Sequence, residues 1–190
     1  MPRLKELNIG ESALIVIDMQ NYFMDPESHA FVPDGKKMIP NIQKLINKYH
    51  ESNQPVIFTS FAVAEGEPDP IMRWWGDSVR EGEMNAEICD ELKPAKEDLV
   101  IRKSTYSSFY KTELEEYLHK KNVKQLVITG VLTNLCCETT AREAFCRNFN
   151  VFVVEDCVAS YDEDQHRNSL ENLAYGFAVI TESGEILKNG

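Results

Sequence analysis

Six short apolar runs, separated by segments with helical patterns, constrain the fold of this chain more than any other feature. They cover residues 13–17, 55–61, 99–101, 125–129, 151–154 and 178–181, and Val and Ile are common in them. Strands with one face in water alternate apolar and polar residues, whereas continuous apolar runs are typical of strands buried on both faces. The runs therefore predict a mostly parallel β-sheet with helices on both faces.

Apolar residues recur at helical spacing in the connections between these runs. The stripes lie within residues 39–53, 114–118, 137–145 and 170–174, and Pro40 stands near the start of the first. This βαβ order predicts an α/β fold, namely a three-layer α/β/α sandwich around a six-stranded, mostly parallel, doubly wound sheet. A chain of 190 residues with 43% hydrophobic content can form its own core, so we expect one domain over residues 1–190.

Two connections, residues 21–34 and 62–98, do not follow this βαβ order. The second is long and contains three glycines and the adjacent Trp74 and Trp75. Connections of this length inside a compact domain are often lids or binding loops. We therefore expect a lid-like segment at about residues 62–98.

Charge and hydropathy exclude several classes of partner. The net charge of −11 and the pI near 4.9 would repel a phosphate backbone, so we expect no nucleic acid partner. The first twelve residues lack the apolar region of a signal peptide, and no apolar stretch approaches the roughly 20 residues that span a bilayer. We expect a cytoplasmic protein without a membrane partner, acting on a small molecule.

The five cysteines favour free thiols over a disulfide framework, because their number is odd and two of them are adjacent. They are Cys89, Cys136, Cys137, Cys146 and Cys157. We expect Cys146 and Cys157 to be buried as small apolar residues. Cys137 falls on a helical stripe with Ala141, Ala144 and Phe145, which predicts a place in the core, whereas Cys136 lies about 100° around the helix from it.

Three residues with reactive side chains stand where predicted strands end. Asp18 follows the first strand, Lys103 the third and Cys136 the fourth. In doubly wound sheets the ligand crevice lies at the carboxyl ends of the strands, where the strand order reverses. These side chains can therefore meet in one crevice, although a loop-initiating role remains the simple alternative for Asp18.

The three side chains together suit nucleophilic catalysis. The thiolate is the nucleophilic form of cysteine, so such a site is expected to lower the thiol pKa. Lys103 can do so through its charge, and a helix start capped by Thr133 or Asn134 would add a partial positive charge. Asp18 can accept the thiol proton and later deliver it to a leaving amine.

The motifs D18-M-Q, K103-S-T-Y-S-S-F109 and G130-V-L-T-N-L-C136 together resemble the isochorismatase-like cysteine hydrolases. The resemblance extends from about Ser12 to Thr181. It implies a catalytic triad of Asp18, Lys103 and Cys136 that forms a covalent intermediate, which water then releases. It also implies a cis peptide bond between Val131 and Leu132, with the Leu132 and Cys136 amides forming an oxyanion hole.

The same resemblance bears on metal and substrate. Nicotinamidases of this family have a D-x-H metal motif after the second strand, where this chain reads TSFAVAEGEPDP. We therefore expect no metal, no cofactor and no nicotinamidase activity. The sequence TNLCCETTAREA is similar to ureidoacrylate and carbamoyl amidohydrolases, whereas WWGDSVREGEMNAEICDELKP and SYDEDQHRNSL are similar to isochorismatases, which cleave a vinyl ether and commonly lack the cysteine.

Aromatic side chains near these motifs can form the wall of a substrate pocket and would suit a planar amide. The candidates are Phe23, Trp74, Trp75, Tyr106 and Phe109, of which Phe109 could equally pack in the core. The four histidines have no partners at metal-ligand spacing, and we expect them to be surface or capping residues.

The leading hypothesis from the sequence is hydrolysis of a small amide or carbamoyl compound through a covalent cysteine intermediate. Vinyl ether hydrolysis with Asp18 as the acid is the first alternative, and a non-catalytic redox or binding module with an oxidisable Cys136 is the second. The family resemblance further suggests a homo-oligomer, either a dimer or a tetramer.

Overall fold

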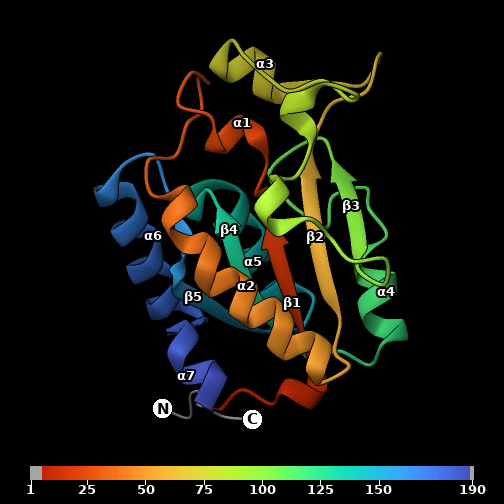
Figure 1. Ribbon diagram of the computed structural model, residues 1–190, viewed down its shortest axis with the longest axis vertical. Coiled ribbons are helices and arrows are strands. Elements are labelled where there is room, and N and C mark those ends of the chain that lie inside the picture. Colours follow the sequence, from red (N-terminus) through yellow and green to blue (C-terminus); the bar gives the residue numbers. More distant parts are fainter. Residues whose placement is uncertain (1–5, 189–190) are drawn as a thin grey trace.

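The computed structural model describes residues 6–188 (Figure 1). The first five of the twelve N-terminal residues that lack the apolar region of a signal peptide lie outside this range. Within this range a six-stranded sheet has the order β3-β2-β1-β4-β5-β6, and every neighbouring pair of strands is parallel. The strands are β1 (Ser12–Ile17), β2 (Val56–Phe61), β3 (Leu99–Lys103), β4 (Gln125–Val131), β5 (Asn150–Ala159) and β6 (Val179–Thr181). The predicted α/β class and all six strands are confirmed.

Helices cover both faces of the sheet, as the continuous apolar runs predicted. They are α1 (Asn21–Met24), α2 (Gly35–Glu51), α3 (Pro70–Trp75), α4 (Leu114–Lys120), α5 (Glu138–Cys146), α6 (Glu163–Gly176) and α7 (Ser183–Lys188). Helix α2 begins four residues before the predicted stripe, so Pro40 lies inside it and cannot donate a backbone hydrogen bond there.

Alternate residues of β1 contribute to two separate cores. Leu14 and Val16 pack with apolar residues of α2 and α7, whereas Ala13, Ile15 and Ile17 pack with those of α4, α5 and α6. Successive side chains of a strand point to opposite faces, so a strand between two helical layers must be apolar at every position. This explains the unbroken run that the sequence shows.

Helix α5 ends with two residues that the sequence analysis placed incorrectly. Cys137, Ala141 and Ala144 are buried as predicted, but Phe145 is 52% exposed and Cys146 is exposed. Cys146 comes two residues after Ala144, which is about 200° around the helix and therefore away from the sheet. Phe145 stacks on Phe177 instead, with 4.7 Å between the ring centroids.

The two long connections lie over the carboxyl ends of the strands, where Figure 1 shows α1 and α3. Residues 62–98 contain α3 and two short 3₁₀ helices, Met84–Ala86 and Asp90–Leu92. The buried Gln20 tethers this connection to β2. Its side-chain NH₂ group donates to the carbonyls of Phe61 and Ala86, and its side-chain oxygen accepts from the Phe61 N–H. No helix within the described residues is both long and apolar enough to span a membrane.

Candidate active site

Asp18 is the first residue after β1 and is completely buried. Its backbone adopts a left-handed conformation with φ of 51°, and its N–H donates to the carbonyl of Thr59 on β2. The Thr59 hydroxyl donates to Asp18 Oδ1 at 2.6 Å. The carboxylate is therefore held in one orientation at the end of the central strands.

Gly130 on β4 permits the close approach that brings β1 and β4 together beside Asp18. It pairs with Ile17, and its φ of 106° belongs to the region that favours glycine. A Cβ atom at this position would lie only 2.0 Å from the Ile17 carbonyl oxygen. The strand order reverses between β1 and β4, so this contact lies at the switch point of the sheet.

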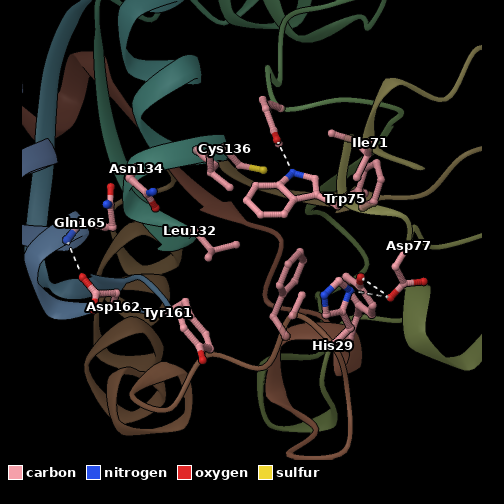
Figure 2. Close-up of a pocket in the computed structure, with 16 residues that line it drawn as sticks. His29, Ile71, Trp75, Asp77, Leu132, Asn134, Cys136, Tyr161, Asp162 and Gln165 are labelled. Atoms are coloured by element: carbon pink, nitrogen blue, oxygen red, sulfur yellow. Dashed lines mark hydrogen bonds and ion pairs between the residues drawn. The ribbon is translucent and has the colours of Figure 1, made fainter. Parts of the chain in front are cut away.

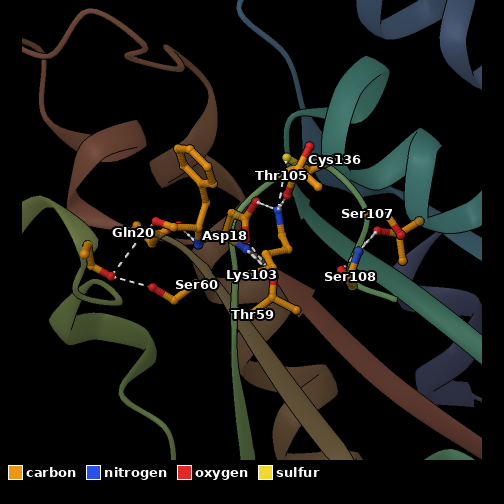
Figure 3. Close-up of polar contacts among 12 residues, drawn as sticks. Asp18, Gln20, Thr59, Ser60, Lys103, Thr105, Ser107, Ser108 and Cys136 are labelled. Atoms are coloured by element: carbon orange, nitrogen blue, oxygen red, sulfur yellow. Dashed lines mark hydrogen bonds and ion pairs between the residues drawn. The ribbon is translucent and has the colours of Figure 1, made fainter. Parts of the chain in front are cut away.

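Lys103 reaches the site from the edge of the sheet. It is the last residue of β3, which is separated from β1 by β2, so its strand does not adjoin the switch point. Its side chain is fully buried, and Nζ lies 2.6 Å from Asp18 Oδ2 in an ion pair. Nζ also donates to the carbonyl oxygen of Thr105 at 2.9 Å and to Cys136 Sγ at 3.4 Å (Figure 3).

Cys136 lies in a π-helical turn, Thr133–Cys137, which leads from β4 into α5. The side-chain cap expected from Thr133 or Asn134 is not formed, because both side chains bond elsewhere. Thr133 Oγ1 contacts His166 Nδ1 at 2.9 Å, and Asn134 Oδ1 accepts a hydrogen bond from Ser160 Oγ at 2.6 Å.

Burial sets the protonation state of the thiol. It raises the pKa of Cys136 to about 12, because the positive charge of Lys103 only partly offsets desolvation and the Asp18 carboxylate raises the pKa further. The sequence predicted a lowered pKa for this thiol, and that prediction is wrong for the protein without substrate. Burial alone would lower the pKa of Lys103, but the charge of the Asp18 carboxylate, which also contacts Nζ, raises it overall.

The resting site is therefore a neutral thiol beside an ammonium–carboxylate pair. Asp18 Oδ2 contacts Lys103 without an aligned hydrogen bond, so this buried oxygen keeps a lone pair for a proton. A thiol, a base and a fixed positive charge are the groups that a concerted attack on a carbonyl carbon needs.

The peptide bond between Val131 and Leu132 is cis, as the family resemblance implied. The Leu132 carbonyl accepts hydrogen bonds from the N–H groups of Leu135 and Cys137, both at 3.1 Å. Leu132 and Cys136 both line the cavity described next. Their role as an oxyanion hole stays a prediction.

A cavity of about 540 Å³ opens beside Cys136 (Figure 2). Sixteen residues line it, namely Tyr22, Phe23, His29, Ala30, Phe61, Ile71, Trp75, Asp77, Tyr106, Leu132, Asn134, Leu135, Cys136, Tyr161, Asp162 and Gln165. The Trp75 ring extends toward Cys136, and its Nε1 donates to the Tyr106 hydroxyl at 2.8 Å. Asp18 and Lys103 lie beneath this wall rather than in it.

Three of the five proposed aromatic residues, Phe23, Trp75 and Tyr106, line this cavity. Phe109 does not, because its ring is buried in the core and stacks on Phe149 with 6.1 Å between centroids. Trp74 does not either, since it is 78% exposed and borders a separate, smaller cavity between α3 and residues 105–106.

Several residues of the cavity wall were not predicted from the sequence. Tyr161 and Asp162 follow β5 after Ser160. The apolar run predicted this strand only for residues 151–154, so the strand-end argument did not reach them. Asn134 stands within the quoted G130-to-C136 motif. Asp77 and His29 come from the two long connections and carry no local pattern that would place them together.

The described histidines have separate partners. His29 Nδ1 lies 3.4 Å from Asp77 Oδ2, and His50 Nε2 lies 2.7 Å from Asp98 Oδ1. His119 is near Glu115, and His166 contacts Thr133. Within residues 6–188 no group of three or more His, Cys, Asp or Glu side chains is placed to hold a metal ion.

Comparisons with known proteins agree with this architecture. The isochorismatase domain model matches residues 12–185. Nicotinamidase 3 of Arabidopsis thaliana is 36% identical over 98% of this chain and 92% of its own length. The isochorismatase of Bacillus subtilis is 34% identical over 92% of this chain, which covers 57% of that longer protein.

A solved structure has the same fold over nearly its whole length. The cysteine hydrolase from Pseudomonas syringae pv. phaseolicola 1448A superposes with a TM-score of 0.94, at 26% identity, over 99% of this chain and 96% of that protein. The domain match, the fold and the strand-end arrangement of Asp18, Lys103 and Cys136 coincide. The chain therefore belongs to the isochorismatase family of hydrolases.

Proposed function

We propose that this protein hydrolyses a C–N bond in a small amide or carbamoyl compound through a covalent intermediate on Cys136. One observation carries the proposal: the Cys136 thiol borders the cavity and contacts Lys103, which in turn pairs with Asp18. Nucleophile, positive charge and base are thus within reach of one bound molecule. The similarity to a nicotinamidase supports amide chemistry.

The first step forms the acyl-enzyme. As Cys136 Sγ attacks the carbonyl carbon, the thiol proton passes to Asp18 Oδ2, and the carbonyl π electrons move to the oxygen. The N–H groups of Leu132 and Cys136 would stabilise that oxyanion. The C–N bond then breaks, Asp18 returns its proton to the leaving nitrogen, and a thioester remains.

The second step regenerates the enzyme. A water molecule gives a proton to Asp18 while its oxygen attacks the thioester carbon, and the C–S bond breaks. The sulfur takes the proton back from Asp18, so the site returns to a neutral thiol. Lys103 keeps its charge throughout and stabilises negative charge as it develops on sulfur.

Vinyl ether hydrolysis is the competing chemistry, because the chain is also similar to an isochorismatase. That reaction needs a carboxylic acid to protonate carbon, whereas Asp18 forms an ion pair with Lys103 and accepts a hydrogen bond from the Thr59 hydroxyl. The geometry therefore favours Asp18 as a proton acceptor over Asp18 as the initial acid.

The decisive experiment compares Cys136→Ala with the unchanged protein on a panel of amides, carbamoyl compounds, nicotinamide and isochorismate. We expect C–N cleavage to fall by at least about 10³-fold in the variant, because the nucleophile is lost. Intact-mass spectrometry should show a transient adduct in the unchanged protein, located on Cys136 by peptide mapping.

Cys146→Ala is the matched control, since it also removes one thiol but at an exposed position outside the cavity. It should retain activity. Amide turnover that survives Cys136→Ala would refute the proposal, and isochorismate turnover in that variant would establish the vinyl ether alternative. Sulfenic acid at Cys136 without turnover of any substrate would indicate the redox module.

A further inference from the structure

The charged groups in the cavity wall are mostly of one sign. Asp77 and Asp162 line it, and within the described residues neither Lys nor Arg does. Figure 2 shows the two carboxylates on opposite sides of the cavity. His29 also lines the cavity, but it is exposed, and its Nδ1 already lies 3.4 Å from Asp77 Oδ2. A molecule extending from Cys136 toward either side therefore approaches a carboxylate.

Lys103 cannot neutralise a negatively charged ligand in this cavity. It is buried beneath the wall, and its ammonium already contacts Asp18, the Thr105 carbonyl and Cys136 Sγ. Its charge is paired with that of Asp18, whose Oδ2 lies 2.6 Å from Nζ. Lys103 therefore does not compensate the negative charge of Asp77 and Asp162 in the cavity wall.

Asp77 is the carboxylate best placed to bind a ligand. Tyr22 donates to its Oδ2 at 2.9 Å, and the Ser78 N–H donates to its Oδ1 at 2.9 Å. His29 Nδ1 also lies 3.4 Å from Oδ2. A carboxylate offers about four acceptor positions, so one remains on a side chain that is still 38% exposed. Asp162, in contrast, is exposed at the start of α6, where it caps the helix by accepting from the Gln165 N–H.

The surfaces around Asp77 also favour positive charge. Tyr22, Phe23, Trp75 and Tyr106 contribute aromatic rings to the same cavity, and the Trp75–Tyr106 hydrogen bond holds two of them in place. The faces of aromatic rings attract cations, by about 0.5–2 kcal/mol depending on solvation. Apolar Ile71, Phe61 and Leu132 complete the wall and strengthen electrostatic interactions by excluding water.

We infer that the substrate is a small amide that bears a positively charged group and no carboxylate, and that Asp77 is the residue that selects it. The inference rests on the proposed C–N hydrolysis. An ammonium or a protonated nitrogen heterocycle would pair with Asp77 while the amide carbon lies at Cys136. A dicarboxylate would face two carboxylates without a partner cation, and the net charge of −11 would also oppose its approach.

The test uses three benzamides of similar size, with a para-aminomethyl, para-hydroxymethyl or para-carboxy group. Isothermal titration calorimetry on Cys136→Ala measures affinity without turnover, and kcat/KM is measured on the unchanged protein. We expect the cationic compound to bind about tenfold more tightly than the neutral one, and the anionic compound to bind weakest. Equal affinities, tighter binding of the anion, or no binding of any of the three would overturn the inference.

Asp77→Asn tests the assignment to this residue. It keeps an oxygen that can accept from Tyr22 but removes the charge, so the preference for the cation over the neutral compound should largely disappear. Asp164→Asn is the matched control, because it removes the same charge from an exposed side chain outside the cavity and should keep the preference. A preference unchanged in Asp77→Asn would contradict the role of Asp77.

Failure of the proposed function would give a different result. If Cys136 does not form an acyl-enzyme, the unchanged protein turns over none of the amides, yet the order of affinities persists. If the cavity has no preference for positive charge, the unchanged protein can still hydrolyse the amides, but the affinities for the three benzamides do not follow the predicted order.

Discussion

At the scale of single residues, the site contains a buried ion pair between Asp18 and Lys103. Burial by itself would disfavour the charged form of each side chain. Asp18 and Lys103 have fully buried side chains, and their ion pair exists because each compensates the other. Removing charges from water costs several kcal/mol per ion, so a buried pair adds little stability by itself. The pair is better explained by the thiol that it contacts than by folding.

Replacing one member of this pair should therefore destabilise the fold more than replacing both. Lys103→Met leaves the Asp18 carboxylate buried without a counter-charge, and we expect the free energy of unfolding to fall by about 3–5 kcal/mol. Urea denaturation followed by circular dichroism measures the change. Amide turnover should be lost as well.

The double variant Asp18→Asn with Lys103→Met is the control for this prediction. It removes both charges, so it should be more stable than Lys103→Met alone, although equally inactive. If the two substitutions instead destabilise additively, the ion pair is not the reason for the loss.

At the scale of elements, the position of the site depends on how closely β1 approaches β4. The ends of these strands carry Asp18 and the turn that contains Cys136, and Gly130 permits their contact with Ile17. The connection over residues 62–98 is a second element of the site, because it supplies Trp75 and Asp77 while Gln20 tethers it to β2.

Gly130→Ala should lower the free energy of unfolding by about 2–6 kcal/mol. The new Cβ would overlap the Ile17 carbonyl, and alanine rarely adopts the positive φ found there, so overpacking and backbone strain add. Gly184→Ala in α7 is the control, because a Cβ there meets nothing within 4 Å. It should be neutral or stabilise by up to about 1 kcal/mol. Similar effects of both substitutions would contradict the importance of this contact.

At the scale of the whole molecule, buried thiols make stability depend on alkaline pH. Burial raises the pKa of Cys89 to about 11 and of Cys136 to about 12, and it also raises that of Cys157. A thiol whose pKa is higher in the folded than in the unfolded chain stabilises the fold fully below the unfolded pKa near 9. This contribution is lost as the pH rises through the folded value.

We therefore expect the free energy of unfolding to decrease between pH 9 and about pH 11. Urea denaturation in the presence of a reductant, at several pH values across this window, measures the decrease. Cys89→Ala should show a shallower decrease, because alanine does not titrate. A free energy that stays constant or rises across the window would show that the thiols do not keep their protons in the fold.

The division of residues 1–190 into one domain and the dimer or tetramer expected from the family resemblance stay predictions. Light scattering coupled to gel filtration would determine the number of subunits directly.

Local sequence pattern was sufficient for the sheet, most of its helices and the three reactive residues at strand ends. Continuous apolar runs arise because each strand is buried on both faces, and parallel strands bring their carboxyl ends to one edge of the sheet. Both effects can be recognised from short stretches of sequence. The same reasoning separated Cys136 from Cys137, because helical geometry depends on neighbouring residues.

Other properties depended on contacts between distant residues. The strand order placed Lys103 on the edge strand, so that its long side chain must pass β2 to reach Asp18. Desolvation then raised the pKa of Cys136, Phe109 became a core residue, and Asp77 joined Tyr22 and His29 in the cavity wall. Burial and pairing between such segments arise only when the whole chain packs, which is why tertiary structure alone decided them.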